Sequence, residues 1–242
     1  MLDVHPPHQA AHSWRDFFIH IATIVIGLLI AIGLEQTVEY LHHRHQLREL
    51  REAIQQDDEK ALRDDTDVER WSAAQVAGLT ARIDDVTVAI RTNTHAHSIP
   101  MNMPPFRSLP IDPAWKAANT SGLANIMPQE DVKVFSELDI LIAGLGAEFR
   151  DHAATFRRMA FEQRFRVSSA DQKLDFASAT RAELIEDLTL LSEELSHAKA
   201  EYDWTLYLRG ALQQIIGGER NLDRIDDAED AAVDKASRAP AR

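Results

Sequence analysis

The stretch "FFIHIATIVIGLLIAIGL", residues 17–34, decides how the rest of the sequence is interpreted. It contains no Asp, Glu, Lys or Arg, and Asp16 and Glu35 bound it. A helix of this length extends about 27 Å, close to the roughly 30 Å hydrocarbon core of a bilayer. Trp14 and Tyr40 flank the run, where an aromatic belt would lie. The length of this run and its lack of acidic and basic residues together predict a transmembrane helix.

A cleaved export signal and a buried core helix are the two alternatives for this run. Ala31 and Gly33 have the small-x-small spacing of a cleavage site, and Arg15 supplies a weak positive flank. However, the run continues without a break into residues 34–54, "LEQTVEYLHHRHQLRELREAI", which have a helical pattern. Because cleavage needs an extended segment, and a core helix usually shows a polar stripe, an uncleaved signal anchor is favoured.

One face of the predicted anchor is not purely apolar. Steps of three and four residues align Asp16 with His20, Thr23, Gly27 and Ala31. Small residues let membrane helices approach closely, and a buried histidine needs a polar partner. The stripe therefore predicts a contact with a second copy or with another membrane protein. In the alternative interpretation, His20 lies near the interface and reaches the headgroups.

Charge limits the partners and leaves the orientation open. The formal net charge of −13 argues against nucleic-acid binding, which needs a basic surface. The predicted partners are the lipid bilayer, through residues 17–34, and a second copy or another membrane protein. Three arginines (Arg44, Arg48 and Arg51) follow the anchor, which by the positive-inside rule favours a cytoplasmic domain. Interleaved glutamates weaken that signal, so the side of the domain is unresolved.

The remainder of the chain has the periodicity of long helices. Apolar residues recur at steps of three, four and seven to about residue 92, and no proline occurs between Pro7 and Pro100. A second helix is predicted from about Pro128 to Arg166. A third ends at Gly217 and starts after a capping-box pattern at either Ser169 or Thr180. The fold class is all-α, with the transmembrane helix continuing into an antiparallel bundle or hairpin stalk that carries a short capping helix.

Composition sets the predicted boundaries. Residues 1–16 are an N-terminal tail and residues 17–34 the transmembrane helix. Residues 35–218 form the bundle domain, with a Pro-rich loop at residues 93–113. Residues 219–242 are charged and weakly periodic, so we expect a disordered tail.

A short helix after the Pro-rich loop is predicted to close the bundle. In "DPAWKAANTSG", residues 112–122, Asp112 can cap the helix and Gly122 can end it. Trp115 is the expected buried anchor, and Ser121 precedes the glycine. This short helix either only closes the bundle or also presents a binding surface.

No pattern in the sequence is typical of catalysis. There is no Walker loop, nucleotide fingerprint, G-x-S-x-G or H-E-x-x-H, and there are no cysteines. We therefore expect a protein that is not an enzyme and has no cofactor. The one metal hypothesis concerns copper, because imidazole and thioether ligands suit its monovalent ion. Its candidate ligands are His95, His97, Met101 and Met103, although such methionines more often pack on the end of a bundle.

The sequence resembles uncharacterised single-pass inner-membrane proteins of Gram-negative bacteria. The resemblance rests on residues 12–50, with Gly27 to Ala31 in a Gly-x-Leu-Ile-Ala-like segment, and on residues 112–139, with Trp115 followed by Ser121 and Gly122. It implies a membrane helix followed by a helical domain and no particular activity. The expected function is a scaffold, sensor or assembly partner acting through protein–protein contacts in the bacterial inner membrane. The alternative is copper handling in the envelope through the loop at residues 95–103.

Overall fold

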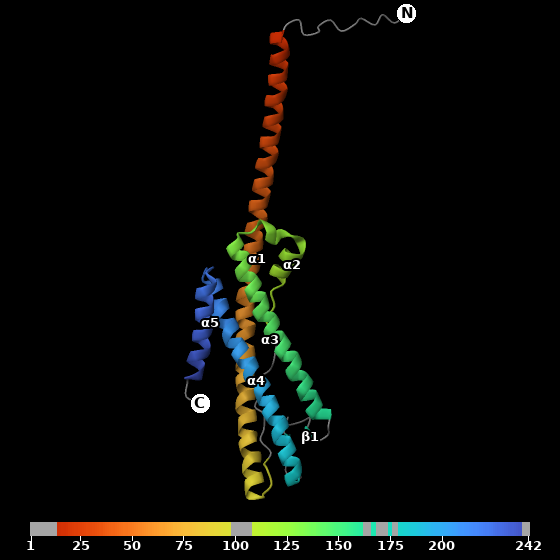
Figure 1. The fold of residues 1–242 in the computed structure, drawn as a ribbon, viewed down its shortest axis with the longest axis vertical. Helices are drawn as coiled ribbons and strands as arrows, with labels where there is room; N and C mark the ends of the chain where they lie inside the picture. Colours follow the sequence, from red (N-terminus) through yellow and green to blue (C-terminus); the bar gives the residue numbers. More distant parts are fainter. Residues whose placement is uncertain (1–13, 98–107, 162–165, 168–173, 176–178, 239–242) are drawn as a thin grey trace, which may run out of the picture. The chain divides into compact units, whose positions relative to one another are not determined.

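The computed structural model describes residues 14–97, 108–161, 166–167, 174–175 and 179–238, and it has an all-α fold, as predicted. The chain divides into two compact units, Met1–Leu50 and Arg51–Arg242. Helix α1 (Trp14–Thr92) contributes to both units (Figure 1). The other elements all belong to the second unit: α2 (Pro113–Ser121), the 3-10 helix η1 (Leu123–Ile126), α3 (Gln129–Phe161), β1 (Arg166–Val167), β2 (Leu174–Asp175), α4 (Arg181–Ile216) and α5 (Leu222–Ser237).

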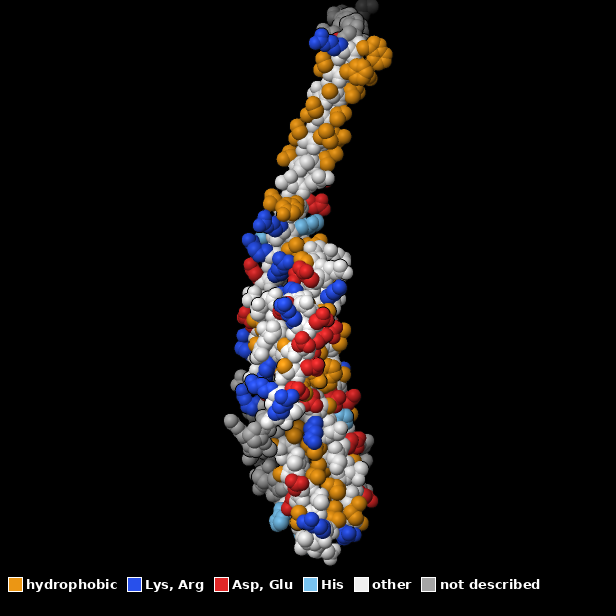
Figure 2. Space-filling model, turned by 60° about the vertical axis from the view of Figure 1, so that its left-hand side comes forward, with side chains coloured by type: hydrophobic (Ala, Val, Ile, Leu, Met, Phe, Trp, Pro, Cys, Tyr) orange, Lys and Arg blue, Asp and Glu red, His pale blue; other side chains and the backbone are white. Residues whose placement is uncertain are grey.

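The described part of the first unit is a helix with its apolar side chains outside. Leu28, Leu29 and Ile30 are 60%, 63% and 59% exposed, and the most apolar window has a mean hydropathy of 2.6 with none of it buried. Figure 2 shows apolar side chains along this helix on the face in view. Within the described residues, α1 is the one helix long and apolar enough to cross a membrane.

The second unit is held together where the residues of α1 after position 50 pack against α4. Val86 of α1 and Leu191 of α4 are fully buried in one apolar cluster with Leu79, Leu184 and Ala198. These residues recur at steps of seven along each helix, so one stripe per helix faces the other. Helix α3 packs on α4 as well (Figure 1).

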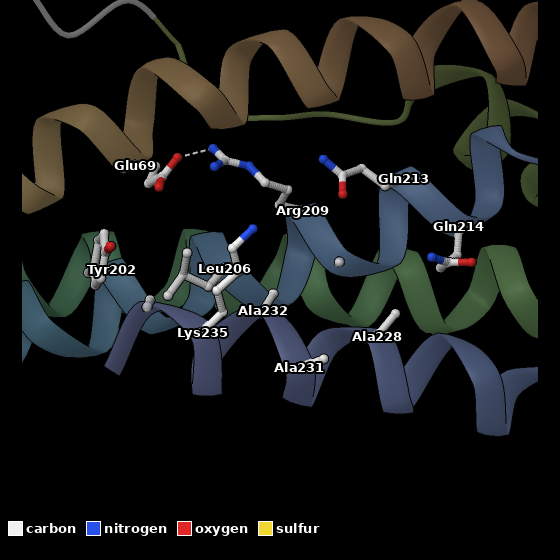
Figure 3. A pocket seen from close by; sticks show the side chains of 12 residues that line it. Glu69, Tyr202, Leu206, Arg209, Gln213, Gln214, Ala228, Ala231, Ala232 and Lys235 are labelled. Carbon is white, nitrogen blue, oxygen red and sulfur yellow. Dashed lines mark ion pairs between the residues drawn. The ribbon is translucent and has the colours of Figure 1, made fainter. Parts of the chain in front are cut away.

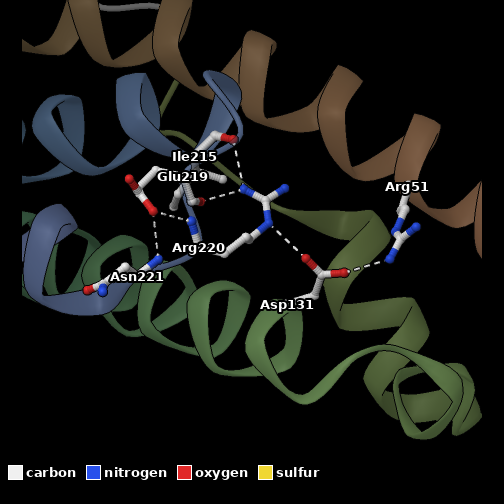
Figure 4. Close-up of polar contacts among 6 residues, drawn as sticks. All are labelled: Arg51, Asp131, Ile215, Glu219, Arg220 and Asn221. Carbon is white, nitrogen blue, oxygen red and sulfur yellow. Dashed lines mark hydrogen bonds and ion pairs between the residues drawn. The ribbon is translucent and has the colours of Figure 1, made fainter.

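An arginine network joins the start of α3 to the end of α4. The Arg220 guanidinium donates from Nε to Asp131 Oδ1 at 2.7 Å and from Nη1 to the carbonyl of Ile215 at 3.0 Å (Figure 4). Arg51 donates to the other Asp131 oxygen at 2.9 Å. Asp131 thus links three helices, because Arg51 lies on α1, Asp131 on α3, and Arg220 follows α4 and satisfies one of its last carbonyls.

The start of α4 and the structure of the residues after it could be predicted only in part from the sequence. Thr180 and Glu183 form a complete capping box, so α4 starts at the second of the two expected positions. The expectation of a disordered tail over residues 219–242 was wrong for its described part. Residues 222–237 form α5, which packs on α4, and its Ile225 is 1% exposed. This buried isoleucine supplies the tertiary contact that stabilises a charge-rich helix.

Candidate functional site

The stripe predicted on the anchor lies on an open helix surface. His20, Thr23, Gly27 and Ala31 are all exposed, and a Cβ added at Gly27 would have no atom within 4 Å. The Thr23 hydroxyl donates to the carbonyl of Ile19 at 2.8 Å, so its hydrogen bond is satisfied within the helix. The face is therefore accessible to a second helix, and Thr23 does not require a partner there.

The structure describes only part of the predicted copper loop. Met101 and Met103 lie outside the described residues. His95 and His97 are exposed, and His97 is held by Asp85, whose carboxylate lies 2.7 Å from its Nδ1 and 2.6 Å from its backbone nitrogen. No group of three or more His, Asp or Glu side chains in the described part of the chain is arranged to hold a metal ion. Copper binding stays a prediction.

The predicted closing helix is α2, and Trp115 of its motif packs into the bundle, whereas Ser121 is exposed. Trp115 is 3% exposed and its ring lies 5.7 Å from that of Phe135. Gly122 follows α2 with φ of 82°, a conformation that favours glycine. The Ser121 hydroxyl donates to the carbonyl of Ala118 at 3.2 Å. Asp57 of α1 accepts from the backbone nitrogen of Ala114 at 2.8 Å, which fixes the start of α2.

The principal buried cluster of ionisable groups, which sequence reasoning missed, joins α3 to α4. His152 of α3 is 5% exposed and lies between two carboxylates of α4. Its Nε2 is 2.6 Å from Glu194 Oε2, and its Nδ1 is 2.7 Å from Glu201 Oε1. Glu194 is 1% exposed and Glu201 is fully buried. One imidazole therefore bridges two buried carboxylates.

A second pair lies beside this bridge. His197 Nδ1 is 2.6 Å from Glu148 Oε1, and the His197 and His152 rings stack with centroids 5.9 Å apart. Trp71 of α1 covers the other side, with its ring 6.4 Å from that of His152. The three helices thus enclose five ionisable side chains, the two histidines and the three glutamates Glu148, Glu194 and Glu201.

Electrostatics give the bridge a bound proton. Burial lowers the pKa of His152, but hydrogen bonds with Glu194 and Glu201 outweigh burial and raise that pKa to about 9. Burial also raises the pKa of Glu201. His152 contacts both carboxylates directly, and the arrangement holds a proton between α3 and α4.

The spacing of these residues carried a usable signal. Glu148 and His152 are four residues apart, and Glu194, His197 and Glu201 follow steps of three and four. Each set therefore shares one helix face. The signal was missed because acidic side chains on a helix are mostly exposed, and the sequence does not reveal which face is buried.

A groove between α1, α4 and α5 has a volume of about 620 Å³. Figure 3 shows Glu69 of α1 paired with Arg209 of α4 on one side and the alanines of α5 on the other. Arg209 Nε also lies 3.7 Å from Asp65, which is fully buried. Burial raises the pKa of Asp65 to about 8, so this carboxyl holds a proton at neutral pH.

Comparisons of the chain with protein-family models, with curated proteins and with solved structures find no match. The resemblance to single-pass inner-membrane proteins therefore stays a prediction.

Proposed function

We propose that this protein is a single-pass protein of the bacterial inner membrane that acts through protein–protein contacts, as a scaffold, sensor or assembly partner. One observation carries the proposal: the window of mean hydropathy 2.6 near the N-terminus is entirely unburied. Exposing so much apolar surface to water is unfavourable, and a bilayer removes it from water. The second unit supplies a helical domain in which several charged residues are paired between helices, such as Arg51 with Asp131.

The stripe of His20, Thr23, Gly27 and Ala31 is the proposed contact face of the anchor. Small side chains on this face allow a second helix to come close, which strengthens packing inside a bilayer. The chain offers a matched control, because Gly27 and Gly33 are both exposed glycines with no atom within 4 Å of an added Cβ. Six residues separate them, so Gly33 lies on a different face of the helix.

A membrane two-hybrid assay of the full chain tests this contact. Gly27→Leu should abolish self-association, or association with a copurified membrane partner, while Gly33→Leu should leave it intact. The same chain, extracted in mild detergent, should migrate as a defined oligomer or with a partner. A clean monomer in detergent, together with no effect of Gly27→Leu in the membrane, would contradict the proposed function.

A further inference from the structure

Helix α5 packs on α4, and the contact contains an unsatisfied carboxyl group. It carries six acidic and two basic residues, and its one buried residue is Ile225. At the crossing with α4, a Cβ on Gly210 would lie 2.8 Å from the Cα of Glu229 and 2.9 Å from the carbonyl oxygen of Ala228. The two backbones are therefore in direct contact at Glu229.

The Glu229 side chain finds no compensation for a negative charge among the described residues. Its Oε1 is buried and has no hydrogen-bond partner there. The charged groups of the described chain that face it are all acidic: Asp226 and Asp230 from α5, and Glu137 from α3. Helix α4 presents the uncharged Gly210 at this point. Across the groove, Glu69 of α1 and Arg209 of α4 are paired with each other.

We propose that α5 is a pH-responsive arm, docked on α4 when Glu229 is protonated and released when Glu229 is ionised. Ionisation places a charge on a half-buried group among three carboxylates, and release returns that charge to water. The contact at Gly210 keeps the backbone of Glu229 against α4 while α5 stays docked. Release would also uncover Leu206 of α4, which lines the groove and is 5% exposed in the docked form.

The expected pH window follows from the docked form. Burial, followed by Asp226, Glu137 and Asp230, raises the pKa of Glu229 from 4.5 to about 7. The docked arm therefore holds a proton that the released arm loses as the pH rises from 4.5 toward 7. Docking is favoured below pH 4.5 and weakens as the pH rises from 4.5 to about 7. Above pH 7 both forms have lost the proton, so a further rise in pH does not change the docking equilibrium. The release of α5 does not depend on the proposed function. In a sensor, the apolar surface that it uncovers on α4 would be available to a partner.

Spin labels on the full chain in lipid nanodiscs test the proposal. The chain has no cysteine, so Ile140→Cys on α3 and Ser237→Cys on α5 provide the only two labelling sites. Both positions are exposed. Double electron–electron resonance should give one narrow distance distribution at pH 5.5. At pH 8.5 it should give a broader and longer one, with the docked-to-released ratio lowered about thirtyfold, because docking weakens about tenfold per pH unit between pH 5.5 and 7.

Three variants separate Glu229 from other groups that titrate. Glu229→Gln should keep the narrow distribution at both pH values. Asp227→Asn, an exposed neighbour on α5, and Asp65→Asn, at the groove, should both respond to pH like the unmodified chain. An unchanged distribution in the unmodified chain, or a pH response that survives in Glu229→Gln, would overturn the proposal. Neither result shows whether the anchor contacts a partner. A failure of the pH proposal can therefore be distinguished from a failure of the proposed function.

Discussion

Two stretches of α1 place apolar and charged residues in opposite environments. Residues 17–34 contain no acidic or basic side chain and keep their large apolar groups exposed. Residues 51–92 bury Asp58, Asp65 and Arg82, which are 3%, 0% and 1% exposed. The two stretches of this helix thus suit different surroundings: the first is apolar enough for lipid, and the second lies in a protein interior, where Asp65 comes within 3.7 Å of Arg209 of α4.

The largest expected effect comes from breaking the buried bridge of the second unit. His152→Leu leaves Glu194 and Glu201 buried without their shared cation, which should lower the free energy of unfolding by about 3–5 kcal/mol. The loss should be greater at pH 8 than at pH 5, because protonation neutralises the stranded carboxyls. Denaturant unfolding of the full chain in detergent, followed by circular dichroism, measures it.

The matched control for that variant is His97→Leu, at an exposed histidine that also pairs with a carboxylate. An exposed pair contributes about 0–1 kcal/mol, so the control should stay close to the unmodified chain. Replacing His152, Glu194 and Glu201 together with leucine should restore part of the loss, because no charge is then stranded. Equal effects of His152→Leu and His97→Leu would show that burial of the bridge does not matter.

An effect on stability is also expected from pH alone, without any substitution. Burial raises the pKa of Asp58 to about 7 and that of Asp65 to about 8, from 3.8. The folded chain then holds protons that the unfolded chain has lost, so stability should fall as the pH rises from about 4 to about 8. Each group contributes at most about 1.4 kcal/mol per pH unit. His152 extends the fall toward pH 9, since stability from a raised histidine pKa is lost as pH rises through it.

Asp65→Asn should flatten this pH profile, and Asp84→Asn, at an exposed position of α1, should not. Urea midpoints at pH 5 and pH 8 provide the comparison. A urea midpoint that rises with pH in the unmodified chain would mean that folding does not raise the pKa values of Asp58 and Asp65.

The smallest expected effect concerns the packing of α5. Gly210→Ala adds a Cβ that would collide with the backbone at Glu229, and such overpacking costs about 1–3 kcal/mol. Gly146→Ala on α3 meets only the end of Arg150 at 3.6 Å, so it should instead stabilise its helix by about 0.5–1 kcal/mol. Hydrogen exchange across residues 222–237 should increase in the first variant only. Equal protection of residues 222–237 from exchange in the two variants would mean that α5 does not cross α4 at Gly210.

The contrast between the two stretches also explains what could be predicted from the sequence. Residues 17–34 are apolar enough to predict a transmembrane helix from composition alone, and the Thr180–Glu183 box is a local signal that marked one of two possible starts of α4. The buried bridge depends on residues 49 positions apart, His152 and Glu201, and no local pattern pairs them. The helical state of α5 likewise depends on Ile225 and on the glycine of another helix, which composition cannot reveal.

Alkaline carbonate extraction of membranes containing the full chain tests the central claim most directly. The proposed transmembrane anchor predicts that the protein stays in the membrane pellet, and that the double variant Ile24→Arg with Leu28→Arg moves to the supernatant. Each arginine near the centre of a membrane helix costs about 2.5–3.5 kcal/mol, enough together to oppose insertion. Release of the unmodified chain by carbonate would contradict the account, because residues 17–34 would then be covered by protein rather than by lipid.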